Sequence, residues 1–217
     1  MRAPDTLQDA LDVVVPFVRG RPGRSIIGIC GPPAAGKSTL STALSDAIDT
    51  RDGLSSVAVP MDGFHLSNVE LDRLGLADRK GAPETFDAGG FVHLLRRLRA
   101  DPALEELVYA PSYSRVLHES IGGVIPVAAG VRVIVVEGNY LLLDRGPWAS
   151  VRGLLDLALY LDAPAAVRQD SLVRRQLAKG LDLHDAHDWV ERSDERNAAV
   201  IAATRDRADL ILTRSSA

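Results

Sequence analysis

The sequence predicts an α/β protein with a mainly parallel five-stranded sheet, helices on both faces of the sheet, and a small hairpin or lid insertion. Two observations predict this class. Apolar runs of strand length alternate with segments of helix length, which is typical of parallel sheets covered on both faces. A glycine-rich turn joins the first apolar run to a helix-length segment. The chain of 217 residues contains no linker-like tract, so we expect a single domain over residues 1–217.

The elements follow from apolar spacing. Strands are predicted at residues 26–30, 56–60, 131–136, 157–161 and 210–212. Helices are predicted at residues 6–18, 37–48, 88–100, 164–179 and 184–205. The pieces 107–109 and 123–127 are too brief for core strands of the sheet, and they predict a hairpin-like insertion within about 79–127.

Composition excludes several classes of function. A net charge of -4 and a pI near 5.7 leave no basic footprint for nucleic acid, so the cluster Arg96, Arg97 and Arg99 is interpreted as a solvated helix face. The sequence has no signal-peptide core and no apolar stretch of membrane length, which predicts a soluble, cytoplasmic protein. The single Cys30 excludes an internal disulfide and is interpreted as a core residue.

The glycine-rich turn has the pattern of a P-loop. It comprises Gly31, Pro32, Pro33, Ala34, Ala35, Gly36, Lys37, Ser38 and Thr39. Backbone N–H groups of such a turn point at one spot, and the dipole of the following helix adds positive potential there. Lys37 is expected to reach the outer phosphates of ATP, and Ser38 is expected to hold Mg²⁺. The fold class is therefore the three-layer sandwich of P-loop NTPases.

Three predicted strands end in an acid, at the sheet edge where the P-loop must also lie. Asp162 is followed by Ala163 and Pro164, which favours a helix cap over a site role. For Glu137 the capping alternative is weaker, so we expect its carboxylate to serve the Mg²⁺-bound phosphates. Asp62 is interpreted as the base that accepts the proton of an attacking hydroxyl, with a turn-forming role as the alternative.

Other polar segments are candidates for binding the acceptor or the transferred group. His65 follows Asp62 closely, and substrate contact and scaffold are equal alternatives for it. The loop with Arg79 and Lys80 suits an anionic or polyhydroxy acceptor, although it can also be an exposed connection whose Asp87 caps the next helix. The helix predicted at 164–179 carries Arg168, Arg174 and Arg175, and it could close as a lid over the phosphates. A solvated face explains these arginines nearly as well.

In this order the features resemble the family of uridine kinases, pantothenate kinases and phosphoribulokinases, over residues 26–212. Residues 59–64, with sequence VPMDGF, resemble the family's strand that ends in a catalytic Asp. Residues 135–138, VVEG, resemble its acid-glycine pair near the metal. Residues 79–87 resemble the Lys-Gly-x-Pro loop of bacterial pantothenate kinases, and residues 110–114, APSYS, resemble the Pro-x-Tyr segment that lines the acceptor pocket.

The resemblance implies a role for individual residues. Asp62 would be the base, Lys37 with the lid arginines Arg174 and Arg175 would stabilise phosphoryl charge, and Lys80 and Tyr113 would lie on the acceptor side. One departure concerns the acceptor: Asp62-Gly63-Phe64-His65 differs from the Asp-Ser-Phe-Tyr type of uridine kinases. The greatest likeness is to a branch called nucleoside kinase-like or fructose-transport-system kinase.

The sequence thus predicts an ATP-dependent kinase that phosphorylates a hydroxyl of a small polar metabolite with Mg²⁺. Alternatives are a nucleotide-switched regulatory ATPase or GTPase, and an ATP-binding protein without acceptor phosphorylation. No Asn-Lys-x-Asp guanine motif is present in the sequence. The acceptor stays open among a nucleoside, a pantothenate-like acid, a sugar or a sugar phosphate. Nucleic acid and membrane are not expected as partners, and a homodimer is one open oligomeric state.

Overall fold

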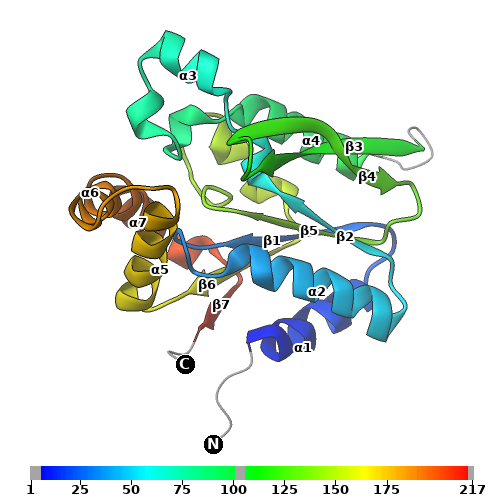
Figure 1. Cartoon of the computed structure of the whole chain (residues 1–217). Helices are drawn as coiled ribbons and strands as arrows, with labels where there is room; N and C mark the ends of the chain where they lie inside the picture. Colours follow the sequence, from blue (N-terminus) through cyan, green and yellow to red (C-terminus); the bar gives the residue numbers. More distant parts are fainter. Residues whose placement is uncertain (1–5, 101–105, 215–217) are drawn as a thin grey trace, which may run out of the picture.

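A five-stranded parallel sheet forms the centre of the computed structural model, which describes residues 6–100 and 106–214 (Figure 1). The terminal residues of the predicted single domain, together with 101–105 in the predicted insertion, lie outside the described residues. The strand order is β2-β5-β1-β6-β7. The strands are β1 (Ser25–Cys30), β2 (Ser56–Pro60), β5 (Val133–Gly138), β6 (Leu157–Asp162) and β7 (Leu210–Thr213). All four pairings in this sheet are parallel, which confirms the predicted fold class.

Helices cover both faces because successive side chains of a strand point to opposite faces. On one face, Ile27 and Ile29 of β1 pack with α1 (Thr6–Arg19) and α2 (Lys37–Asp52). On the other face, Ile26 and Cys30 pack in a core that includes α4 (Ala88–Arg99). The central strands β1 and β5 are buried along their whole length, as expected for a parallel sheet between two layers.

A hairpin lies above the α4 face of the sheet (Figure 1). Its strands β3 (Leu107–Ser114) and β4 (Glu119–Ala128) pair with each other in a separate two-stranded sheet. The predicted insertion is therefore present, but its strands are 8 and 10 residues long rather than the brief pieces expected. The short helix α3 (Asn68–Leu74), which precedes it, was not predicted.

The helical segment predicted at 184–205 is not one regular helix. It contains α6 (Leu183–Trp189), a π-helical turn (Val190–Asp194) and α7 (Glu195–Ala202). With α5 (Ala165–Ala178) these elements gather at one end of the sheet (Figure 1). A small apolar cluster of Leu172, Val173, Ala186 and Val190 holds α5 against α6. No helix in the described part of the chain is long and apolar enough to cross a membrane.

Candidate active site

The P-loop connects the central strand β1 to the start of α2. Two of its glycines are needed for geometric reasons. A Cβ at Gly31 would lie 2.4 Å from the carbonyl oxygen of Leu161, and Gly36 has a φ of 100° in the left-handed region. Gly36 also caps α2 without a side-chain hydrogen bond. The first N–H groups of α2 are consequently open to an anion.

Lys37 is the first residue of α2, and its side chain is almost fully buried. Its Nζ donates a hydrogen bond of 3.0 Å to the carbonyl oxygen of Pro32. Burial lowers the pKa of Lys37, and the nearby carboxylate of Glu137 raises it in opposition. A buried ammonium with a single protein acceptor retains donors for phosphate oxygens.

Glu137 meets Ser38 because β5 lies beside β1 in parallel register, with Ile29 paired to Glu137. The Oγ of Ser38 donates a hydrogen bond of 2.8 Å to Oε1 of Glu137. Glu137 is 5% exposed and lies within β5 rather than after it. The pKa of the Glu137 carboxyl is raised to about 7. Burial is the larger cause, and the negative charge of Asp62 is the second.

These residues fit a magnesium ion. Mg²⁺ prefers oxygen ligands and is usually bound by one or two carboxylates or hydroxyls together with substrate phosphates. The Ser38 hydroxyl and the Glu137 carboxylate supply such oxygens beside the P-loop. A cation there would favour the ionised form of Glu137, which burial and Asp62 disfavour. No cluster of three or more His, Cys, Asp or Glu residues suited to a metal occurs among the described residues.

Asp62 lies in a 3-10 turn (Met61–Phe64) directly after β2. Gly63 allows this turn to pass close to the hairpin, because a Cβ there would lie 2.4 Å from the carbonyl oxygen of Pro111. Asp62 and Glu137 together border a small hollow of about 160 Å³, which Ser38 and Tyr113 also line. The carboxylate of Asp62 is thus delivered to the same edge of the sheet as the P-loop.

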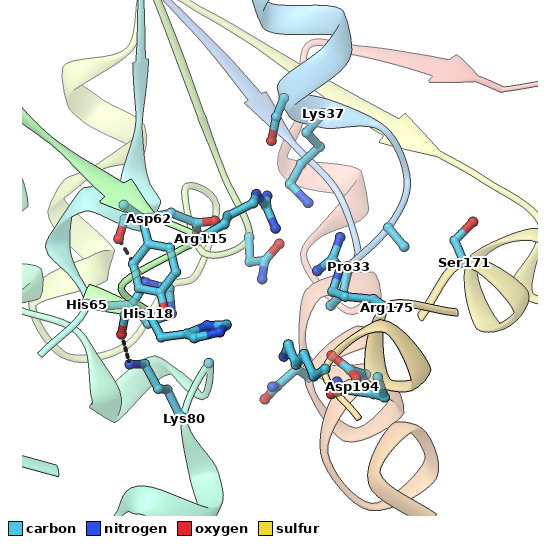
Figure 2. A pocket seen from close by; sticks show the side chains of 18 of the residues that line it. Pro33, Lys37, Asp62, His65, Lys80, Arg115, His118, Ser171, Arg175 and Asp194 are labelled. Carbon is cyan, nitrogen blue, oxygen red and sulfur yellow. Dashed lines mark hydrogen bonds between the residues drawn. The ribbon is translucent and has the colours of Figure 1, made fainter. Parts of the chain in front are cut away.

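Asp62 and the P-loop also line one large pocket of about 810 Å³. Figure 2 shows two walls facing each other, with Lys37 between them at one end. We call one wall the hairpin wall; it consists of Asp62, His65, Lys80, Tyr113, Arg115 and His118. We call the other the helical wall; it consists of Ser171, Arg175, Lys179, Asp194 and Asn197. The pocket therefore presents a nucleotide-binding loop and a set of polar groups to one shared space.

The hairpin wall is held together by its own side chains. The Nδ1 of His65 lies 2.8 Å from the carbonyl oxygen of Asp62, and its ring lies 4.8 Å from that of Tyr113. Burial lowers the pKa of His65, so the neutral imidazole is favoured. Lys80 donates to Asn68 Oδ1 and, at 2.8 Å, to the carbonyl oxygen of His118. Its Nζ also lies 5.4 Å from the centroid of the Tyr113 ring.

Comparison with known proteins identifies the family. The model of the Phosphoribulokinase / Uridine kinase family matches residues 26–217. The chain belongs to this family. YggC of Escherichia coli, an uncharacterised protein, is 33% identical over 190 residues, which cover 87% of this chain and 77% of YggC. A Schizosaccharomyces pombe protein provisionally named uridine kinase C227.14 is 34% identical over 196 residues, which cover 87% of this chain and 83% of that one.

A solved structure extends the likeness over nearly the whole chain. The protein from Silicibacter sp. TM1040 provisionally named fructose transport system kinase is 38% identical and superposes with a TM-score of 0.88. The match covers 96% of this chain and all of that one. The chain is accordingly a P-loop kinase, a phosphotransferase with an alcohol group as acceptor.

In this kinase several sequence-predicted residues do not reach the pocket. Arg174 is 77% exposed and pairs with Asp170 one turn away, while its neighbour Arg175 lines the pocket. Arg79 forms an ion pair with Glu84 on the surface. Arg168 is buried and pairs with Glu195 at 3.1 Å, which ties α5 to α7. Of the lid arginines, the structure therefore brings only Arg175 to the site.

Two acids have structural roles. Asp87 caps α4 by accepting a hydrogen bond of 2.8 Å from the N–H of Gly90, as the capping alternative predicted. Asp162 does not cap α5, which corrects the sequence interpretation. The N-cap of α5 is Pro164, without a side-chain bond, and Asp162 instead pairs with Arg205 at 3.2 Å.

Eight polar pocket residues of the kinase were missed by sequence reasoning: Arg115, His118, Asn139, Ser171, Gln176, Lys179, Asp194 and Asn197. Arg115 and His118 lie in the turn of the hairpin, whose strands were predicted too short to bring them to the site. Asp194 and Asn197 lie at the π-helical turn and the start of α7. Lys179 carried one available signal, since it is one of three lysines in an arginine-rich chain.

Proposed function

We propose that this protein transfers the γ-phosphoryl group of ATP to a hydroxyl group of a small polar metabolite, with Asp62 as the general base. One observation carries the proposal: the Asp62 carboxylate of the hairpin wall and the P-loop ammonium of Lys37, at one end of the pocket, line the same space. A hydroxyl placed between them would have a proton acceptor on one side and a phosphoryl donor on the other. Catalysis in such a site depends mainly on positioning and on electrostatic stabilisation.

The transfer step assigns each group a role. The acceptor oxygen attacks the γ-phosphorus, its proton passes to Asp62, and the bond between the γ-phosphorus and the bridging oxygen breaks as ADP leaves. Lys37, the N–H groups at the start of α2, and Arg175 would stabilise negative charge on the transferred group. Mg²⁺, held by Ser38 and Glu137 when bound, would neutralise charge on the phosphates.

Pocket size supports a small acceptor. The volume of about 810 Å³ must hold the phosphate end of ATP as well as the acceptor, and small-molecule sites commonly measure roughly 300–1,000 Å³. His65, Lys80 and Tyr113 would contact the acceptor, because they line the hairpin wall beside Asp62. Arg174 and Arg79 have no part in this scheme.

The proposal is tested by ADP release with Mg²⁺ and ATP across nucleosides, pantothenate, sugars and sugar phosphates. We expect ADP release that depends on one class of acceptor and that falls by about 10²–10⁴-fold in Asp62→Asn, with ATP affinity near that of the wild type. Asp49→Asn, on the exposed face of α2, is the matched control. Acceptor-independent hydrolysis would instead support a nucleotide switch, and ATP binding without turnover would support a binding protein.

A further inference from the structure

Cationic side chains of the pocket lie on both sides of it. The described lining contains five cationic side chains: Lys37, Lys80, Arg115, Arg175 and Lys179. It contains three carboxylates: Asp62, Glu137 and Asp194. Lys37 and Arg175 lie on the side of the P-loop and the lid helix, where the triphosphate would bind. Lys80 and Arg115 lie on the hairpin wall, beside the proposed base.

The positive charge of Arg115 opposes the rise in the pKa of the Glu137 carboxyl, but the two groups form no direct ion pair. No hydrogen bond and no ion pair within 4.0 Å joins its side chain to another described residue, although it lines both the large pocket and the hollow beside Asp62 and Glu137. Figure 2 shows Arg115 extending from the hairpin wall into the pocket. A guanidinium presents five donors in a planar fork that matches carboxylate or phosphate oxygens. Its donors are therefore available to an anion bound in the pocket.

Lys80 lines the same pocket, and three contacts fix the position of its ammonium group. Two protein oxygens, from Asn68 and His118, accept hydrogen bonds from its Nζ, and the Tyr113 ring lies below it. His118 adopts a φ of 54°, in the left-handed region, and the carbonyl it presents there is the one that binds Lys80. None of these three partners is a carboxylate. The nearby Glu119 carboxylate accepts a hydrogen bond from the backbone N–H of Asn68 instead. The ammonium thus stays without an ion pair among the described residues.

We propose that the acceptor is an anion, a small molecule with a carboxylate or a phosphate group in addition to the reacting hydroxyl, and that Arg115 and Lys80 bind this negative group. The inference rests on the proposed function and narrows it to one substrate class. Arg115 and Lys80 are specificity residues in this scheme, and they touch the acceptor rather than the transferred phosphoryl group. A neutral acceptor of the same shape would leave the guanidinium of Arg115 and the ammonium of Lys80 without a direct ion pair.

Matched pairs of acceptors test the inference. We would compare pantothenate with pantothenol and glycerate with glycerol for the carboxylate arm, and fructose 6-phosphate with fructose for the phosphate arm. For the pair of acceptors that the enzyme phosphorylates, we expect kcat/KM to be at least tenfold higher for the anion than for the neutral molecule. Arg115→Leu is expected to remove that preference through the KM of the acceptor, with the KM of ATP unchanged. Arg73→Leu, an exposed arginine paired with Glu70 on α3, removes the same charge outside the pocket and should keep the preference.

The outcomes separate this inference from the proposed function. A neutral acceptor that is used as well as its anion overturns the inference and leaves the kinase assignment standing. A rise in the KM of ATP in Arg115→Leu also overturns it, because Arg115 would then belong to the nucleotide site. Absence of turnover with every acceptor counts against the proposed function instead.

A second measurement does not need turnover. Phenylglyoxal modifies free arginines, and peptide mass spectrometry can follow Arg115 in the wild-type protein saturated with Mg²⁺ and ADP. Inorganic phosphate and malonate, as probe anions, are expected to slow modification of Arg115 at least several-fold, and less so in Lys80→Met. Modification of Arg73 should not change. Equal rates at Arg115 with and without the anions would overturn the inference.

Discussion

Ser38 at the start of α2 and Glu137 within β5 are joined by a hydrogen bond of 2.8 Å, although 99 residues separate them in sequence. Both groups are oxygen ligands of the kind that Mg²⁺ prefers, and their closeness follows from the parallel pairing of β1 with β5. The bond joins the phosphate loop and the acid of the neighbouring strand β5 into one unit.

Glu137→Gln should raise the Mg²⁺ concentration needed for half-maximal turnover by about 10- to 100-fold. The amide keeps the shape and can still accept from Ser38, but it lacks the charge that attracts the cation. The measurement is turnover against Mg²⁺ concentration at saturating ATP, with the exposed Glu70→Gln as control. An unchanged Mg²⁺ dependence would remove Glu137 from the metal site.

Lys37→Ala should weaken ATP binding and lower kcat by about 10²–10³-fold, since a buried donor to the phosphates is lost. Lys37→Arg should not restore activity, because the larger planar guanidinium does not fit the buried position that the compact ammonium occupies. Calorimetric titration with ATP and single-turnover kinetics measure both effects. Arg51→Ala, at the exposed end of the same helix, should change neither, and rescue by arginine would contradict the requirement for an ammonium.

Gly63→Ala should lower the free energy of unfolding by about 1–3 kcal/mol. A Cβ at this position would lie 2.4 Å from the carbonyl oxygen and 2.6 Å from the carbonyl carbon of Pro111, so the turn that carries Asp62 would have to move away from the hairpin. Turnover should also fall, because Asp62 would move with the turn. Urea unfolding measures the change in the free energy of unfolding. Gly89→Ala in the exposed start of α4, where the nearest atom to a new Cβ is 3.7 Å away, should stabilise the protein by up to about 1 kcal/mol.

Asp194→Asn should stabilise the nucleotide-free protein at pH 7. Burial raises the pKa of the Asp194 carboxyl from 3.8 to about 6, and its Oδ2 is buried without a hydrogen bond to the described residues. The folded state therefore binds this proton more tightly than the unfolded state, and its stability falls as pH rises from about 4 to 6. The cost above pH 6 is about 1–3 kcal/mol, and the amide avoids it.

Urea unfolding at pH 4.5 and pH 7 measures this difference. Between pH 4.5 and pH 7 the free energy of unfolding should fall less in Asp194→Asn than in the wild type, by about 1–3 kcal/mol. Asp49→Asn, an exposed control, should keep the wild-type slope. An identical slope in the wild type and Asp194→Asn would show that Asp194 is ionised without penalty.

The fold could be predicted from the sequence because its signals are local. The P-loop places its glycines between a strand and a helix, and the five apolar runs mark the five strands of the sheet, of which the inner ones are buried on both faces. The strand-end acids followed from the same apolar runs, and the family resemblance then supported the roles of Asp62 as base and of Glu137 near the metal. In the structure, β1 and β5 are buried throughout, and Asp62 and Glu137 border the same hollow.

The parts that were missed depend on contacts between distant segments. The β4 strand contains two adjacent glycines and a proline, which disfavour a strand unless a partner such as β3 is present. Arg115 and His118 reach the pocket only because that hairpin packs over the Asp62 turn. Helix α3 did have a local signal, since Ser67 accepts from the N–H of Glu70 as in the start of a capping box.

The separate hairpin sheet has an evolutionary consequence. Strands β3 and β4 share no ladder with the five-stranded sheet, yet β3 contributes Tyr113 to the pocket, and the turn between the two strands contributes Arg115 and His118. Mutations within this one contiguous stretch could change which metabolite is recognised while the strands that carry the phosphate loop are inherited unaltered. A lineage with such an architecture can diversify its substrates through this segment together with the loop that carries Lys80, and the phosphoryl-transfer apparatus does not have to be reinvented each time.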